Sequence, residues 1–137
     1  MKEQELLLRF FALYYSYENY KKGLKKFLNS FMSANRNLGI HDKDELKNLF
    51  VSSINLLVAA KGKDLFRKGK SVNAALFDSV MIGVAKRLQS RSMGVEECRH
   101  LYDSLIQDSE YMEYTVTSTA DEKQIKGRIG KAVEHFA

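Results

Sequence analysis

Hydrophobic side chains recur along the chain at α-helical spacing, and the most apolar stretch is 66–88, FRKGKSVNAALFDSVMIGVAKRL. With successive residues 100° apart, its large side chains form one continuous arc: Leu76, Phe77, Val80, Met81, Val84 and Leu88. Four smaller or flanking apolar residues cover most of the remaining surface: Ala74, Ala75, Ile82 and Ala85. A helix that is apolar on nearly all sides lies at the centre of a fold. The pattern therefore predicts a central helix over about 72–89, capped by Ser71.

The other apolar stripes predict helices that surround this one. The expected elements are helices over 2–16, 18–38 and from about 43 to Gly62, a loop over 61–70, the central helix, a break at 90–94, a helix over 95–107, a short helix within 108–118, and a last helix that begins after Thr119. We found no internal repeat, linker or low-complexity tract. Residues 1–137 are therefore predicted to form a single compact all-α domain of six or seven helices.

Composition agrees with a soluble helical domain. The 137 residues are 45% hydrophobic and 28% charged, and the absence of proline leaves long helices uninterrupted. No stretch approaches the ~20 apolar residues of a membrane span, and the first residues do not resemble a signal peptide. The single cysteine, Cys98, excludes an internal disulfide. We expect a cytoplasmic protein without membrane contact.

The formal net charge of +5 is compatible with a nucleic-acid partner but does not require one, because 17 acidic residues are mixed among the 22 basic ones. Four lysines border the apolar stripe of the second predicted helix: Lys21, Lys22, Lys25 and Lys26. A solvated helix face explains them better than a track for phosphates.

The loop before the central helix is a second basic candidate. Its sequence from Gly62 to Ser71 resembles a phosphate-binding P-loop, but six residues instead of four separate the two glycines, and a helix precedes it where the motif needs a strand. We therefore reject a nucleotide site of that type. A weaker anion site at a helix N-terminus remains, with sequence-independent contacts to nucleic-acid backbone from Arg67, Lys68, Lys70 and Ser71. The alternative is a solvated turn.

Asn73 projects onto the apolar arc of the central helix. A polar group there must form hydrogen bonds or it destabilises the fold. We expect Asn73 to be a buried structural residue that ties down the preceding loop, an interpretation we prefer to contact with a ligand.

The first predicted helix has an unusually wide apolar face for a terminal helix. We expect part of it to remain exposed as an interface with a partner or a second copy, through Leu7, Phe11, Tyr14 and Tyr15.

No catalytic or metal-binding constellation emerges from the sequence. His41, His100 and His135 lie on separate elements without a carboxylate or cysteine at ligand spacing, and Cys98 faces a different side of its helix from His100. We therefore expect no metal, no cofactor and no enzymatic activity for this chain alone.

Three segments resemble the C-terminal helical half of GmrSD-type proteins, which are bacterial phage-defence proteins with a ParB/sulfiredoxin-like N-terminal domain. They are ELLLRFFALYYSYENYKKGLKKFLNSFM, FRKGKSVNAALFDSVMIGVAKRL and TSTADEKQIKGRIGKAVEHF. The residues that match family patterns are Met1, Glu5, Leu6, Leu8, Arg9 and Phe10 in the first, Asn73, Leu76, Phe77 and Asp78 in the second, and Lys126, Arg128 and Ile129 in the third.

The resemblance implies a part of an NTP-dependent restriction protein that attacks foreign, often modified, DNA. In that family an Asp-Gly-Gln-Gln-Arg-type motif in the N-terminal half carries the nucleotide chemistry, and an HNH nuclease domain often follows the helical half. This chain has neither, and its match starts at Met1, inside the family pattern. We therefore expect the non-catalytic helical portion of a longer protein, which supports a nuclease domain. The alternative is a stand-alone helical module that binds another protein through its first helix.

Overall fold

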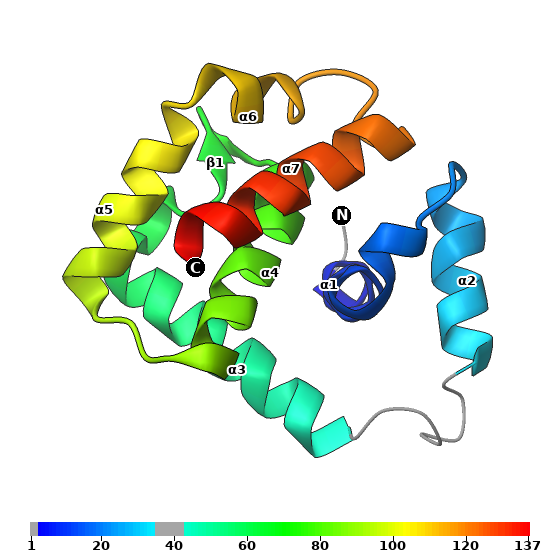
Figure 1. Cartoon of the computed structure of the whole chain (residues 1–137), viewed down its shortest axis with the longest axis horizontal. Coiled ribbons are helices and arrows are strands. Elements are labelled where there is room, and N and C mark those ends of the chain that lie inside the picture. The colour runs from blue at the N-terminus through cyan, green and yellow to red at the C-terminus, as the bar shows by residue number, and fades with distance from the viewer. Residues whose placement is uncertain (1–2, 35–42) are drawn as a thin grey trace.

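The computed structural model describes residues 3–34 and 43–137, and within these ranges seven α-helices form the fold (Figure 1). The helices are α1 (Glu3–Ser16), α2 (Leu24–Ala34), α3 (Lys43–Lys61), α4 (Ala74–Ser90), α5 (Val95–Ile106), α6 (Ser109–Glu113) and α7 (Glu122–Phe136). The remaining elements are 3-10 turns at Tyr17–Asn19 and Gly62–Asp64 and the strands β1 (Arg67–Lys68) and β2 (Ser71–Val72). The predicted all-α fold is confirmed.

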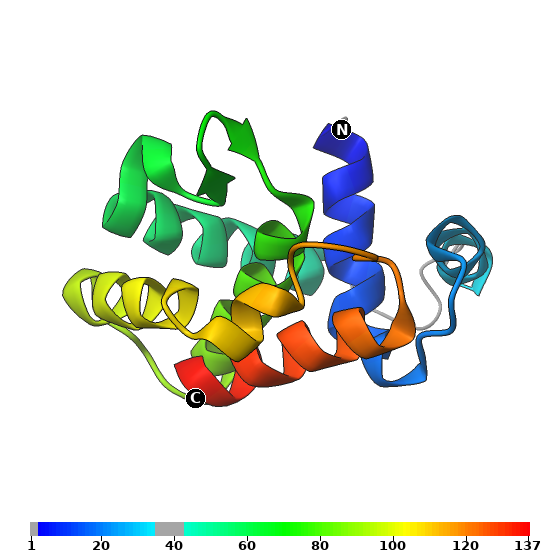
Figure 2. The same cartoon turned by 90° about the horizontal axis from the view of Figure 1, so that it is seen from above.

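Helix α4 is the centre of the molecule, as its apolar sequence predicts. Every residue from Ala75 to Ala85 is buried. Helices α1, α3 and α7 pack directly against it, and its contact with α7 is the most extensive (Figures 1 and 2). Because α4 is covered from several sides, it has no face left for water, which explains the absence of a polar stripe from its sequence.

The crossing of α4 and α7 is unusually close at one glycine. A Cβ atom on Gly83 would lie 2.8 Å from the carbonyl oxygen of Ala132 and 2.9 Å from the ring of Phe136. Only glycine fits this backbone approach without moving the helices apart.

The start of α4 differs from the prediction. The helix begins at Ala74 with Asn73 as its N-cap, and Ser71 instead lies on β2, which pairs with β1 in an antiparallel hairpin. Gly69, with φ of 70°, permits the tight reversal between the strands. Strands of two residues are too short to produce a periodic signal, so a plain loop was predicted here.

The second predicted helix, over 18–38, is wrong at its N-terminal end. A 3-10 turn follows α1, and the chain reverses at Gly23, whose φ of 108° is incompatible with a continuous helix. Helix α2 then runs from Leu24 to Ala34, while 35–38 lie outside the described residues. Helix α2 sits at the edge of the molecule beside α1 (Figures 1 and 2). Among residues 24–34, Leu28 alone is buried.

Candidate functional site

The four residues predicted to contact nucleic acid lie together on the β1–β2 hairpin. The register pairs Arg67 with Val72 and Lys68 with Ser71, and Lys70 stands in the turn. The hairpin is anchored at Phe66, which is buried and has a positive φ of 62°. Its N–H donates to the hydroxyl of Tyr102 at 2.9 Å. This hydrogen bond joins the base of the hairpin to α5.

Two of the three hairpin cations are engaged within the protein. The Arg67 guanidinium donates to the carbonyl oxygens of Lys63 at 2.8 Å and Lys70 at 2.6 Å, which stiffens the turn. The Lys68 ammonium donates to Thr115 Oγ1 at 2.7 Å, and partial burial lowers its pKa. Of the predicted contacts, only the side chains of Lys70 and Ser71 are exposed without a partner in the described part of the chain.

Asn73 has a structural role at the junction between the preceding hairpin and α4, which its side chain caps. The residue is half-buried, whereas the sequence predicted a fully buried one. Its Oδ1 accepts hydrogen bonds from the N–H groups of Ala75 at 2.8 Å and Leu76 at 3.0 Å. Its own N–H donates to the carbonyl oxygen of Phe66 at 2.8 Å, which ties the hairpin to the helix. Because Asn73 occupies these donors, the N-terminus of α4 offers little to an external anion.

The predicted interface on α1 is largely covered. Tyr14 is 2% exposed, and the Lys86 ammonium lies 4.3 Å from the centroid of its ring. Phe11 and Tyr15 are half-buried, whereas Leu7 is 36% exposed. The prediction that all four residues form one exposed patch is wrong, because α2 and α4 pack against this helix and Phe50 of α3 lies beside the rings of Phe10 and Phe11.

A buried cluster of three charges, not predicted as a site, joins α1, α4 and α7. Asp78 is fully buried and accepts hydrogen bonds from Arg9 at 2.9 and 3.1 Å and from Arg128 at 2.7 and 2.9 Å. Arg128, also fully buried, donates further to the carbonyl oxygens of Thr119 at 2.7 Å and Tyr114 at 3.3 Å. Two guanidinium groups around one carboxylate leave no accessible group for chemistry.

A signal for this cluster exists in the sequence. Arg9 stands between leucines and phenylalanines, and Asp78 stands in a helix that has no polar face. A charged residue inside an apolar segment is buried only when it is paired. The sequence alone does not say which partners meet, since Arg9 and Arg128 are 69 and 50 residues from Asp78.

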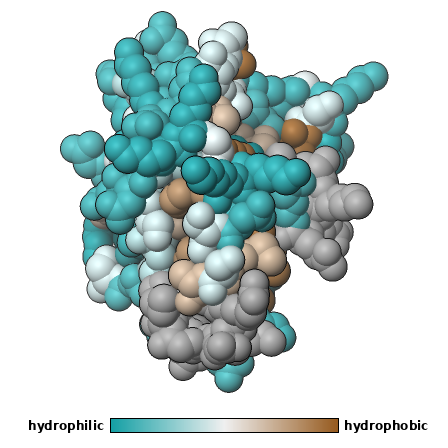
Figure 3. Space-filling view, turned by 90° about the vertical axis from the view of Figure 1, so that its right-hand side faces the viewer, coloured by the Kyte–Doolittle hydropathy of each residue, from teal (hydrophilic) through white to brown (hydrophobic). Residues whose placement is uncertain are grey.

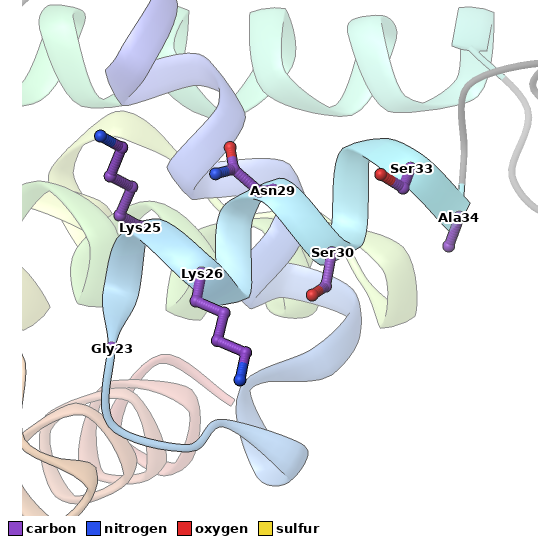
Figure 4. Close-up of a pocket in the computed structure, with 7 residues that line it drawn as sticks. All are labelled: Gly23, Lys25, Lys26, Asn29, Ser30, Ser33 and Ala34. Atoms are coloured by element: carbon purple, nitrogen blue, oxygen red, sulfur yellow. The ribbon is translucent and has the colours of Figure 1, made fainter.

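The lysines near α2 form the other basic surface. Lys22 is paired with Asp121 at 3.2 Å. Lys21, Lys25 and Lys26 are exposed, and no ion pair joins them to the described residues. A shallow open groove runs along the outer side of α2, and Lys25 and Lys26 lie at its N-terminal end (Figure 4). Figure 3 looks onto the side of the molecule where α2 lies, and hydrophilic side chains cover much of it.

The remaining candidates are Cys98 and the three histidines. Cys98 is fully buried, and burial is the main cause that raises its pKa to about 11, so the thiol stays protonated at neutral pH. His135 Nε2 lies 2.9 Å from the carbonyl oxygen of Leu101, His100 is exposed on α5, and His41 lies outside the described residues. No group of three potential metal ligands occurs in 3–34 and 43–137.

Comparisons of the chain with protein-family profiles, with curated proteins and with solved structures found no match. None of the helices in the described ranges combines the length and the apolar character needed to cross a bilayer.

Proposed function

We propose that this chain is the non-catalytic helical portion of a GmrSD-like, NTP-dependent DNA restriction and phage-defence protein, and that it supports the nuclease domain. The observation that carries the proposal is the buried cluster. Each of the three resembling segments contributes one charged residue to it: Arg9, Asp78 and Arg128. One matching residue from each segment thus meets the other two in space, although the three are far apart in the sequence.

The chemistry of the cluster favours a supporting role. Both oxygens of Asp78 accept hydrogen bonds from guanidinium groups, and no side chain in the cluster is exposed above 5%. A buried ion network of this kind cannot reach a substrate, but it specifies how three helices are oriented. Oriented helices provide a rigid platform for a neighbouring domain.

The alternative is a stand-alone module that binds another protein through α1. One observation favours it: Leu7 is 36% exposed beside the half-buried Phe11 and Tyr15. The burial of Tyr14 reduces the apolar area available there. The restriction-protein hypothesis therefore explains more of the observed features.

An antibody raised against the purified chain would separate the two hypotheses. Immunoprecipitation from the organism that encodes the chain, followed by mass spectrometry, is expected to recover it within, or bound to, a polypeptide with an Asp-Gly-Gln-Gln-Arg-type motif or an HNH nuclease domain. Recovery of a separate chain associated with neither would overturn the proposal.

A second experiment tests the non-catalytic role. The purified chain, incubated with nucleoside triphosphates and with modified and unmodified plasmid DNA, is expected to release no phosphate and to leave the plasmid intact. Hydrolysis or cleavage that follows the protein through successive purification steps would contradict this role.

A further inference from the structure

The outer side of α2 and the segment just before it are rich in lysine, and the nearest acidic residue that precedes them is Glu18, in the 3-10 turn Tyr17–Asn19. Residues 19–34 contain four lysines and no aspartate or glutamate. Lys22 is neutralised from α7, because its ammonium pairs with Asp121 at 3.2 Å and its N–H donates to Glu122 at 3.3 Å. The other three lysines have no such partner among the described residues. Together with the exposed polar residues beside them they form a surface that we call the α2 face: Lys21, Lys25, Lys26, Asn29, Ser30 and Ser33.

The uncharged members of the α2 face also suit a polyanion. Figure 4 shows Lys25 and Asn29 along one edge of the helix and Lys26 and Ser30 along the other, with Ser33 further on. All of these side chains are exposed. Lysine, asparagine and serine are residue types that donate hydrogen bonds to phosphate oxygens in nucleic-acid complexes. The face therefore offers both charge and directed donors over the length of the helix.

The arrangement favours nucleic acid over a lipid surface. A helix that binds membranes inserts its apolar side below the headgroups. In α2 that side is turned toward the protein: Leu28 is buried, and Leu24 and Phe27 are half-buried in contact with the core. Met32, at 52%, is the single large apolar residue that the described part of α2 exposes, and one side chain is too little for insertion.

The chemistry also favours a duplex over a single strand. Single-strand binding relies on exposed aromatic rings on which bases stack, and the α2 face contains none. Contacts made only to the backbone of a duplex need no such rings.

We propose that the α2 face binds the sugar–phosphate backbone of duplex DNA, independently of base sequence. The proposal deepens the proposed function, on which it rests for the choice of DNA as the natural polyanion. It also moves the predicted nucleic-acid contact away from the β1–β2 hairpin, where Arg67 and Lys68 already have partners inside the protein.

The test compares two triple variants of the whole chain with equal changes in charge. The first, Lys21→Ala/Lys25→Ala/Lys26→Ala, removes the cations of the α2 face. The control, Lys47→Ala/Lys63→Ala/Lys123→Ala, removes three lysines that are also exposed and unpaired among the described residues and that lie outside both candidate contact surfaces. Each variant lowers the formal net charge of +5 by three. Fluorescence anisotropy with a labelled duplex of mixed sequence would be measured across a salt series, after circular dichroism has shown that both variants are folded.

We expect the first variant to bind the duplex about tenfold or more weakly, with a salt slope shallower by roughly 2–3, because each phosphate contact contributes about 0.9 to the slope. The control is expected to remain close to the wild type. Equal losses in both variants, a loss confined to the control, or no binding by the wild-type chain would overturn the proposal. Binding to anionic phospholipid vesicles that depends on the α2 face, without binding to DNA, would overturn it in favour of a membrane. None of these results alters the outcome of the immunoprecipitation, so the two proposals fail separately.

Discussion

Helices α4 and α2 use charge in opposite ways. Asp78 of α4 is fully buried and held by two arginines from α1 and α7. Lys25 and Lys26 of α2 are exposed, and no acidic side chain of the described residues pairs with them. One helix has its charge neutralised inside the fold, and the other has its charge available at the surface.

The difference separates residues that maintain the fold from residues that are free to bind. Burying a charge costs several kcal/mol unless partners compensate it, so the buried cluster persists only because its geometry is complete. An exposed lysine is solvated and contributes little to stability. Substitutions in the two regions should therefore have separable effects, on stability in the first and on binding in the second.

The largest expected effect follows from Asp78→Asn. This change keeps the shape of the side chain but leaves Arg9 and Arg128 buried without a counter-charge. We expect a loss of about 3–5 kcal/mol in the free energy of unfolding, measured by urea denaturation. The matched control is Asp103→Asn, which breaks the partly exposed Lys61–Asp103 pair and should cost less than about 1 kcal/mol.

If Asp78→Asn fails to fold, a second variant keeps the prediction testable. Arg9→Met/Asp78→Leu/Arg128→Met replaces the whole cluster with apolar side chains, and such replacements are often neutral or stabilising. It should fold where the single variant does not. A single variant as stable as the wild type would show that the cluster does not hold the helices.

The contrast also explains how much the sequence could reveal. The central position of α4 was predictable, because a helix whose own sequence is apolar on all sides is buried on all sides. The exposure of the α2 lysines followed from the same periodicity. The helix break at Gly23 and the N-cap of α4 at Asn73 were not predicted. The spacing of apolar residues does not reveal a change of backbone conformation at a single residue.

The buried cluster was not predictable in the same way. Its three residues come from elements 50 or more residues apart, and a single sequence contains no information on which charges approach each other. The hairpin shows the same limit. Arg67 and Lys68 have the sequence of a basic loop, but their side chains turn to carbonyl and hydroxyl oxygens that only the folded chain supplies.

The next largest effect is expected where α4 meets α7. Gly83→Ala places a methyl group 2.8 Å from the carbonyl oxygen of Ala132, so the helices must separate. We expect a loss of about 1–3 kcal/mol. Gly130→Ala is the control, because nothing lies within 4 Å of its added methyl group and alanine favours a helix interior by about 0.5–1 kcal/mol. Thermal and urea unfolding should therefore show shifts of opposite sign.

A smaller effect is expected at the start of α4. Asn73→Ala removes the side-chain acceptor for the N–H groups of Ala75 and Leu76. The loss should be about 0.5–2 kcal/mol, typical of an N-cap. Asn73→Asp retains the acceptor and adds a negative charge that the helix dipole favours, so it should preserve most of the stability. If both variants lose equally, the long contact from Asn73 Nδ2 to Thr115 at 3.5 Å would matter more than the cap.

The smallest effect concerns Tyr14, whose buried hydroxyl has no hydrogen-bond partner among the described residues. Tyr14→Phe removes this unpaired group and keeps the ring beneath Lys86. At neutral pH the change should be neutral or stabilising by up to about 1 kcal/mol. Tyr111→Phe is the matched control, since it breaks a hydrogen bond of 2.6 Å to Ser79 and should cost about 1 kcal/mol.

The same substitution has a distinct signature at alkaline pH. Burial, with smaller contributions from Tyr15 and Glu45, raises the pKa of Tyr14 from 10.0 to about 12. Above pH 10 the unfolded chain loses the phenol proton while the folded chain keeps it, so the free energy of unfolding falls as the pH rises toward 12. Each such phenol contributes up to about 1.4 kcal/mol per pH unit. Urea titrations between pH 9 and 11 should therefore show a shallower decline for Tyr14→Phe than for the wild type. Parallel declines would mean that the Tyr14 hydroxyl is ionised as readily in the folded protein as in the unfolded chain, and that it is reached by water.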